Sequence, residues 1–244
     1  AVSTRREISV LSYGYDPAAD LRLLSTKVCG SGQEIVVSIN EREHSLLLPL
    51  YGSFQSINAL CALGLVIASG VPSEIAAKAL GHLHGVRGRL DLVVELPNRA
   101  KVFVDYAHTP AALNHTLAAL RDHTKGRLVT VFGCGGDRDT TKRPEMGKVA
   151  AALADQIFVT DDNPRSENPR KIREAILEGC PRAIEVDDRR KAIQRAISDL
   201  HAGDILVVAG KGHETGQIIG STSKPFDDLV EVRRAAASQK GMTF

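Results

Sequence analysis

The first fifty residues consist of short apolar segments separated by turn-forming residues, a pattern typical of β-strands. Four segments rich in Val, Ile, Leu and Thr predict strands: Ile8–Ser12, Leu21–Val28, Glu34–Ile39 and His44–Leu50. The breaks between these segments hold Gly, Pro, Asn and Asp, which favour turns. We therefore expect this part of the chain to form a β-sheet.

A helical pattern follows. Ser56–Ala68 predicts a largely apolar, buried helix that ends before Gly70, and Pro72-Ser73-Glu74 begins a second helix that ends near Gly81. The chain starts at Ala1 without a Met and enters strand-like sequence at once. We therefore expect the first half to be the tail of an α/β domain, and the chain to be a piece of a longer protein.

Beyond Arg89 the pattern changes to a regular alternation of strands and helices. The predicted strands are Lys101–Val104, Leu128–Phe132, Gln156–Thr160, Ala183–Val186 and Asp204–Ala209, and the predicted helices are Ala111–Asp122, Arg143–Leu153, Arg170–Glu178, Arg189–Leu200 and Phe226–Ala237. Such alternation predicts an α/β fold with a mostly parallel, doubly wound sheet covered by helices on both faces. The basic residues of Arg189–Arg195 are expected on a solvated helix face.

Composition narrows the class of protein. The 244 residues are 43% hydrophobic and 25% charged, which is ordinary for a globular protein. The longest apolar run, Ala59–Ala68, is far shorter than the roughly 20 residues of a membrane span. A net charge of +2 gives no electrostatic reason to expect nucleic acid or an anionic membrane as a partner. With no secretory signal and four scattered cysteines, we expect a cytoplasmic protein with reduced, structural thiols.

Unusual residues collect in the loops that follow the predicted strands. Asp105-Tyr106-Ala107-His108-Thr109-Pro110 follows one strand, although a capped helix start alone accounts for Thr109 and Pro110. Gly133-Cys134-Gly135-Gly136-Asp137-Arg138-Asp139 follows the next, and its glycines permit close approach to a ligand. The glycine-rich loop does not match a dinucleotide fingerprint, and the chain contains no P-loop motif.

Two further loops carry charges of both signs. Asp161-Asp162-Asn163-Pro164-Arg165 and Gly210-Lys211-Gly212-His213-Glu214 each follow a predicted strand. A guanidinium grips a carboxylate through two parallel hydrogen bonds, and a carboxylate holds an ammonium group. The carboxyl ends of parallel strands share one edge of the sheet. Taken alone, each loop is also compatible with a solvated turn, but together they predict a site for a zwitterionic ligand.

At these loops the sequence resembles the Mur ligases, ATP-dependent enzymes that form amide bonds in peptidoglycan synthesis. The matching stretches run in family order along almost the whole chain: Tyr13–Asp20 with Arg22, Gly52–Asn58, Gly88-Arg89, Val104–Pro110, Val131–Pro144, Thr160–Arg165 and Ala209–Glu214. The resemblance implies that residues 1–88 are the end of the family's central ATPase domain. Residues 89–244 then correspond to its Rossmann-like C-terminal domain, which receives the incoming amino acid.

The resemblance also implies substrates and site residues. The Asp162-to-Arg165 sequence matches the family's recognition motif for meso-diaminopimelate, which is added to a UDP-N-acetylmuramoyl dipeptide. The residues expected to bind meso-diaminopimelate are Arg138, Asp162, Asn163, Pro164, Arg165, Gly210 and Glu214. Those expected to contact ATP are Asn58, Arg89, Asp105, His108 and Asp137, with Gln55 departing from the Asn that the family usually has. We assign no catalytic nucleophile and no metal ligand in this chain.

The family's UDP-binding domain, its P-loop and the lysine that it carbamylates near Mg²⁺ are not in the sequence. We therefore expect the chain alone not to catalyse ligation. Two alternatives stay open. One is a related ATP-dependent ligase such as folylpolyglutamate synthetase, which does not require the Asp-Asn-Pro-Arg sequence. The other is a non-catalytic amino-acid-binding or scaffold module of the same fold.

Overall fold

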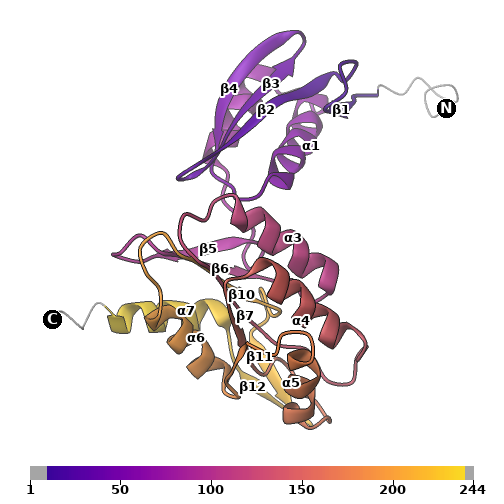
Figure 1. Cartoon of the computed structure of the whole chain (residues 1–244). Helices are drawn as coiled ribbons and strands as arrows, with labels where there is room; N and C mark the ends of the chain where they lie inside the picture. The colour runs from indigo at the N-terminus through magenta and orange to yellow at the C-terminus, as the bar shows by residue number, and fades with distance from the viewer. Residues whose placement is uncertain (1–9, 240–244) are drawn as a thin grey trace, which may run out of the picture. The chain divides into compact units, whose positions relative to one another are not determined.

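The structure, a computed structural model, describes residues 10–239 and divides the chain into two units, residues 1–84 and 85–244 (Figure 1). The division falls a few residues before the boundary that the change of pattern near Arg89 suggested. Each unit has its own hydrophobic core, and each is described by itself. No helix within residues 10–239 is both long and apolar enough to cross a membrane.

The first unit is a four-stranded sheet packed against helices. Its strands are β1 (Tyr13–Gly14), β2 (Leu21–Cys29), β3 (Gly32–Ile39) and β4 (Arg42–Leu48), in that spatial order, followed by α1 (Phe54–Ala68), α2 (Ser73–Ala79) and the 3₁₀ turn η1 (Leu80–His82). β2, β3 and β4 form an antiparallel meander, while β1 runs parallel to β2. The core of this unit lies where β2 and β3 bury Leu21, Ile35 and Val37 under α1.

One predicted strand of this unit is wrong in its described part. Residues 8 and 9 lie outside the described residues, and 10–12 form no strand. The backbone N–H and the hydroxyl of Ser12 both donate to the Asp20 carboxylate, at 2.7 and 2.6 Å. These bonds hold residues 12–20 in a loop that is closed by the Asp20 side chain. Strand pairing therefore starts only at Tyr13–Gly14, which lies after the predicted strand.

The second unit is a six-stranded sheet with the order β5-β6-β10-β7-β8-β9. Its elements are β5 (Asp91–Glu95), β6 (Lys101–Asp105), α3 (Pro110–Arg121), β7 (Leu128–Phe132), α4 (Lys142–Leu153), β8 (Gln156–Val159), α5 (Pro169–Leu177), β9 (Ile184–Glu185), α6 (Arg189–Ser198), β10 (Ile205–Ala209), the hairpin β11 (Gly216–Ile219) and β12 (Thr222–Pro225), and α7 (Asp228–Gln239). All neighbouring strands are parallel except β5 and β6. The structure therefore confirms the predicted mostly parallel sheet.

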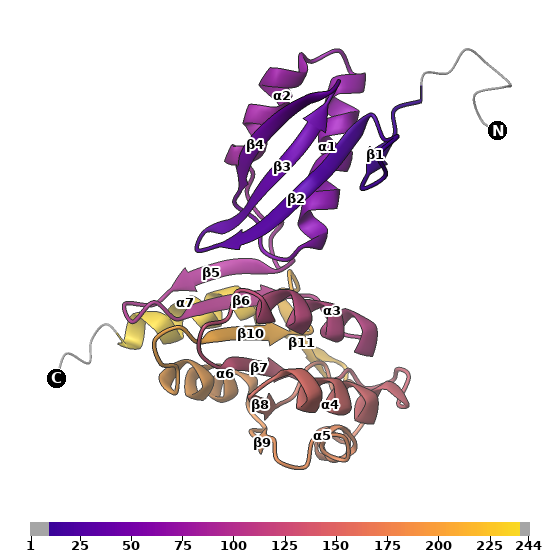
Figure 2. The same cartoon turned by 45° about the horizontal axis from the view of Figure 1, so that its top comes forward.

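Helices cover both faces of this sheet, as predicted (Figure 2). α6 and α7 pack on the face to which Leu206 and Val208 of the central strand β10 point. α3, α4 and α5 follow one another across the opposite face, where Leu113 and Leu117 of α3 are fully buried. Successive residues of a strand point to opposite faces, so the five buried residues of β10 supply both layers of the core.

Three strands of the second unit were not predicted. β5 is an antiparallel edge strand closed on β6 by a tight turn, in which Leu96 N–H donates to the Ala100 carbonyl at 2.8 Å. β11 and β12 form a separate antiparallel hairpin, and the residues of β12 are exposed. Neither β11 nor β12 packs into the large sheet, so neither sequence shows the apolar pattern that predicts a strand.

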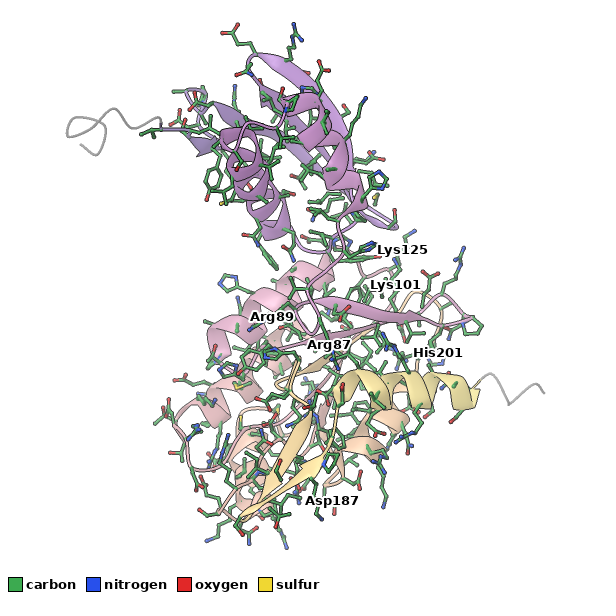
Figure 3. All side chains as sticks on the ribbon, turned by 180° about the vertical axis from the view of Figure 1, so that it is seen from behind. Arg87, Arg89, Lys101, Lys125, Asp187 and His201 are labelled. Carbon is green, nitrogen blue, oxygen red and sulfur yellow. The ribbon has the colours of Figure 1, made fainter. Side chains whose placement is uncertain are left out.

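The chain order of the strands creates a topological switch point at β10. β10 lies between β6 and β7, whose following helices lie on one face, whereas the chain after β10 continues to α7 on the other face. A ligand site is expected where neighbouring strands lead to opposite faces, outside their carboxyl ends. Figure 3 shows Lys101 and His201, which precede or begin strands, at the other end of the unit from these carboxyl ends.

Candidate functional site

The loops after β7 and β8 lie backbone against backbone. Gly136 N–H donates to the Asn163 carbonyl oxygen at 2.9 Å. A Cβ atom on Gly136 would lie 1.9 Å from the Pro164 carbonyl oxygen, and one on Gly133 would lie 2.2 Å from that of Thr160. Only glycine fits at such distances, so the glycines of this loop serve first to let the two loops meet.

Replacing Gly136 by alanine is expected to destabilise the second unit by about 1–3 kcal/mol, because the new methyl group forces the two backbones apart. The matched control is Gly85→Ala, at a glycine with no atom within 4 Å of the added Cβ. Hydrogen exchange of the β7 amides, recorded at increasing urea concentrations, measures the difference in the free energy of unfolding. Equal stability of the two variants contradicts the close packing of these loops.

Two arginines of the predicted site lie at one glycine. A Cβ on Gly135 would be 2.7 Å from Nη1 of Arg165 and 3.8 Å from Cγ of Arg138. Arg165 Nη1 donates to the Gly136 carbonyl at 2.8 Å, and the exposed Arg138 donates to the carbonyl of Asp137 at 2.9 Å. The structure thus brings the guanidinium of Arg165 and the aliphatic stem of Arg138, predicted from different loops, to the same glycine.

The backbone of Arg165 is held by the hairpin that the sequence did not predict. Arg165 has a φ of 52°, in the left-handed region that few side chains adopt. Its N–H donates to the Ile218 carbonyl at 3.1 Å, and its carbonyl accepts from Gly220 N–H at 2.7 Å. These two bonds offset the backbone strain and fix the direction in which the Arg165 side chain leaves the chain.

Acidic side chains of the loops after β8 and β10 lie together. Asn163 Nδ2 donates to Oε2 of Glu214 at 3.0 Å. A Cβ on Gly210 would lie 2.9 Å from Oδ2 of Asp162, so this glycine makes room for that carboxylate. Burial raises the pKa of Asp162, while the positive charges of Arg189 and Lys211 act in the opposite direction. The site therefore contains a carboxylate that a bound cation would stabilise in its ionised form.

Two buried cations behind these acids were not among the predicted site residues. The side chains of Lys211 and Arg189 are fully buried. The expectation that the basic residues of the Arg189–Arg195 segment face solvent is wrong for Arg189, because it forms a bidentate pair with Asp228, at 2.7 Å for each bond. For Lys211 a signal existed: it lies between two glycines directly after a wholly apolar strand.

Asp105, predicted to contact ATP, holds neighbouring segments together through hydrogen bonds to its carboxylate. Its carboxylate accepts from Leu90 N–H at 2.7 Å, Ala107 N–H at 2.9 Å and the Thr116 hydroxyl at 2.9 Å. These bonds tie the segment before β5 to the start of α3. A contact of Asp105 with nucleotide stays a prediction, and the structure adds this structural role.

The predicted ATP residues Arg89 and His108 meet at an aromatic side chain that the sequence analysis did not single out. The Arg89 guanidinium carbon lies 4.3 Å from the centre of the Tyr106 ring. The rings of His108 and His213 have their centres 4.7 and 5.2 Å from that of Tyr106. His108 Nδ1 is 2.8 Å from the Tyr106 carbonyl oxygen, which restricts the ring. The Tyr106 cluster therefore combines planar aromatic faces with the Arg89 cation in the loop after β6.

The other two predicted ATP residues have partners of their own. Asp137 has a φ of 53° and accepts the Ser166 hydroxyl at 2.6 Å, a bond that lowers the pKa of Asp137. Asn58 belongs to the first unit, where it is exposed on α1 and donates to Gln55 Oε1 at 3.1 Å. Gln55, the departure from the family pattern, is thus the direct partner of Asn58.

The cysteines are free, and burial gives the inner ones no reactive character. Cys134 in the glycine-rich loop is buried with its Sγ 3.6 Å from Sδ of Met146. Burial raises the pKa of Cys134 to about 12 and that of Cys180 to about 11. Neither thiol is a nucleophile at neutral pH. Within residues 10–239 no group of three or more His, Cys, Asp or Glu side chains could hold a metal ion.

Comparison with known proteins agrees with this arrangement. The family described as "Mur ligase, glutamate ligase domain" matches residues 88–212. A UDP-N-acetylmuramoyl-L-alanyl-D-glutamate--2,6-diaminopimelate ligase of Caulobacter vibrioides is 52% identical over 227 residues, which are 93% of this chain and 46% of that protein. The ligase of the same name from Chelativorans sp. is 55% identical over 192 residues, 79% of this chain and 40% of its own length.

Solved structures show the same relationship. A structure of a UDP-N-acetylmuramoyl-L-alanyl-D-glutamate--2,6-diaminopimelate ligase matches with a TM-score of 0.74 and 35% identity, over 94% of this chain and 48% of that one. A folylpolyglutamate synthase of Mycobacterium tuberculosis shares the fold, with a TM-score of 0.66 at 22% identity over 99% of this chain and 51% of that chain. The chain belongs to the Mur ligase family, and it spans about half the length of the curated relatives that it matches.

Proposed function

We propose that the chain forms the amino-acid-binding part of a cytoplasmic, ATP-dependent ligase of peptidoglycan synthesis. The ligase joins meso-diaminopimelate to UDP-N-acetylmuramoyl-L-alanyl-D-glutamate, the substrates in the names of its relatives. One observation carries the proposal. Three strand-end loops meet so that the Arg165 guanidinium and the stem of Arg138 lie at one glycine, Gly135, and the same loops carry the carboxylates of Asp162 and Glu214.

The charges of meso-diaminopimelate match these groups. The molecule carries two ammonium and two carboxylate groups, so the end remote from the reacting amine has one charge of each sign. Arg165 and Arg138 can donate hydrogen bonds to the remote carboxylate, and charge-assisted bonds of this kind are the strong ones. Asp162 and Glu214 are placed to take the remote ammonium group. L-Lysine has the ammonium but no remote carboxylate, and leaves both guanidinium groups without a partner.

The chain's residues act in the reaction by binding and orienting the amino acid. ATP supplies the phosphoryl group that activates the γ-carboxylate of D-glutamate toward attack by an amine. The planar faces and the cation of the Tyr106 cluster fit an aromatic base and a phosphate-bearing ligand. The pocket holds one end of meso-diaminopimelate fixed, so that its other amine meets the activated carbonyl in one geometry. Such positioning is a major source of rate enhancement.

Magnesium has no assigned ligand in this part of the ligase. Within residues 10–239 no group of three or more His, Cys, Asp or Glu side chains could hold the ion, and we propose no metal role for the acids of the site. We propose that they take an organic ammonium group instead: Glu214 is held by the Asn163 amide and by Lys211, and the Asp162 carboxylate has no bonded cation within residues 10–239.

Calorimetric titration of the 244-residue chain tests the binding part of the proposal. We expect meso-diaminopimelate to bind at least about 10-fold more tightly than L-lysine, because the charge-assisted bonds to its remote carboxylate contribute about 1.5–3 kcal/mol. Equal affinities for the two amino acids contradict the proposed specificity. In the whole ligase, ATP consumption that requires L-glutamate in place of meso-diaminopimelate supports a folylpolyglutamate synthetase instead.

A further inference from the structure

We propose that Lys211 is a positioning residue, which presents Glu214 and Asn163 to the remote ammonium group of the substrate. The inference rests on the proposed function and extends it to a residue that does not face the substrate. Lys211 lies directly after β10, between Gly210 and Gly212, whose φ angles are +115° and +53°. This backbone turns the side chain inward, and none of its surface is exposed.

The ammonium group of Lys211 joins the two polar loops. Its Nζ atom donates to Oδ1 of Asn163 at 3.0 Å and to Oε2 of Glu214 at 3.1 Å. A buried ammonium group loses its hydration and is tolerated only when paired and hydrogen-bonded. Both partners are therefore required by Lys211, and Lys211 in turn fixes their positions.

The bonds of Lys211 determine which way the Asn163 amide faces. Asn163 Oδ1 accepts from Lys211 and also from Ile218 N–H at 2.9 Å, two donors that the amide nitrogen cannot replace. The amide nitrogen consequently points to Oε2 of Glu214, at 3.0 Å. With Oε2 occupied by two donors, Oε1 of Glu214 accepts no hydrogen bond within residues 10–239. This oxygen is the one left to receive a ligand.

When all three carboxylates around Lys211 are ionised, they outnumber the two buried cations by one. Arg189 and Asp228 neutralise each other through two bonds of 2.7 Å, and Lys211 neutralises Glu214. Asp162, whose pKa burial raises, is left as the unmatched carboxylate. One ammonium group completes the balance. Without Lys211 the same space would hold two unmatched carboxylates, and Glu214 would lose the bond that orients it.

The experiment compares two ligands on variants of the 244-residue chain by calorimetry. The ligands are meso-diaminopimelate and L-2-aminopimelate, which keeps the remote carboxylate and lacks the remote ammonium group. The variants are Lys211→Met, Lys211→Gln, which keeps a hydrogen-bond donor without the charge, and Arg127→Met. Arg127 pairs with Asp204 at 2.7 Å on the opposite edge of the sheet, so its loss lowers stability without touching the site.

In the unmodified chain we expect meso-diaminopimelate to bind about 10- to 100-fold more tightly than L-2-aminopimelate. Both Lys211 variants should lose most of this preference: binding of meso-diaminopimelate weakens about 10-fold or more, while that of L-2-aminopimelate changes less than about threefold. Arg127→Met should keep the full preference despite a lower melting temperature. Lys211→Gln supplies the result if Lys211→Met does not fold.

Three results separate the possible failures. A preference that survives in the Lys211 variants overturns the positioning role. Equal weakening of both ligands also overturns it, because it shows a general loss of structure. If the unmodified chain does not distinguish the two ligands, the proposed function itself fails at the ammonium site, and the inference that rests on it fails too.

Discussion

Replacing Arg165 by alanine is expected to weaken binding of meso-diaminopimelate to the 244-residue chain about 10- to 100-fold, the loss of a charge-assisted contact of about 1.5–3 kcal/mol. Arg165 is the arginine whose backbone the β11–β12 hairpin holds and whose Nη1 atom bonds the Gly136 carbonyl at 2.8 Å. The variant removes both the cation and this link between loops. Calorimetric titration measures the change directly.

Arg170→Ala is the matched control, because Arg170 is exposed and pairs with Glu174 one helical turn away, at 2.9 Å. We expect its affinity for meso-diaminopimelate to equal that of the unmodified chain. Arg165→Lys should bind with intermediate strength, since it keeps the charge without the planar fork of donors. Undiminished binding by Arg165→Ala would remove this residue from the substrate pocket.

Asp228→Asn is expected to cause the largest loss of stability in the second unit, about 3–5 kcal/mol. The Arg189–Asp228 pair has no exposed side-chain surface, and Nη1 of Arg189 has no hydrogen-bond partner among residues 10–239. The substitution therefore leaves a buried guanidinium without its counter-charge. Urea unfolding followed by hydrogen exchange of the β10 amides reports on the unit that contains the pair.

Two further variants show whether the burial of the charge is the cause. Glu174→Gln breaks an exposed pair and should change stability by less than about 1 kcal/mol. Arg189→Met combined with Asp228→Leu removes both buried charges and should recover much of the stability that Asp228→Asn loses. A double variant as unstable as the single one would show that the pair matters through shape and not through charge.

The large sheet was predictable because its central strands are almost wholly buried. β6, β7 and β10 each read as a short apolar run between polar loops, and the start of α3 was visible in Thr109-Pro110. Thr109 accepts the Ala112 N–H at 3.2 Å, as its place before the helix predicts. The edge strand β5 and the β11–β12 hairpin were missed, because pairing at an edge or in a hairpin leaves little apolar pattern.

The meeting of the strand-end loops was predictable for a different reason. Parallel strands end at the same edge, so the order of strands and loops along the chain is enough to expect the loops after four strands in one region. The partners of buried charges were not predictable in this way. Arg189 reads as one of several basic residues on a helix, and only the tertiary contact with Asp228 shows that it is internal. Pairs between residues distant in sequence leave no local signal.

The way in which the β11–β12 hairpin holds Arg165 has a consequence for which mutations of the hairpin the candidate site tolerates. Both bonds to Arg165 come from main-chain atoms, the Ile218 carbonyl and the Gly220 N–H, and the outer residues of the ribbon are exposed. We therefore expect substitutions of the exposed β12 side chains to leave the Arg165 backbone in place, whereas Gln217 of β11 also contacts the site loops, because its Nε2 donates to the Asp162 carbonyl at 2.8 Å. An inserted or deleted residue is expected to have a larger effect, because it shifts the register of the hairpin and breaks the two main-chain hydrogen bonds to Arg165.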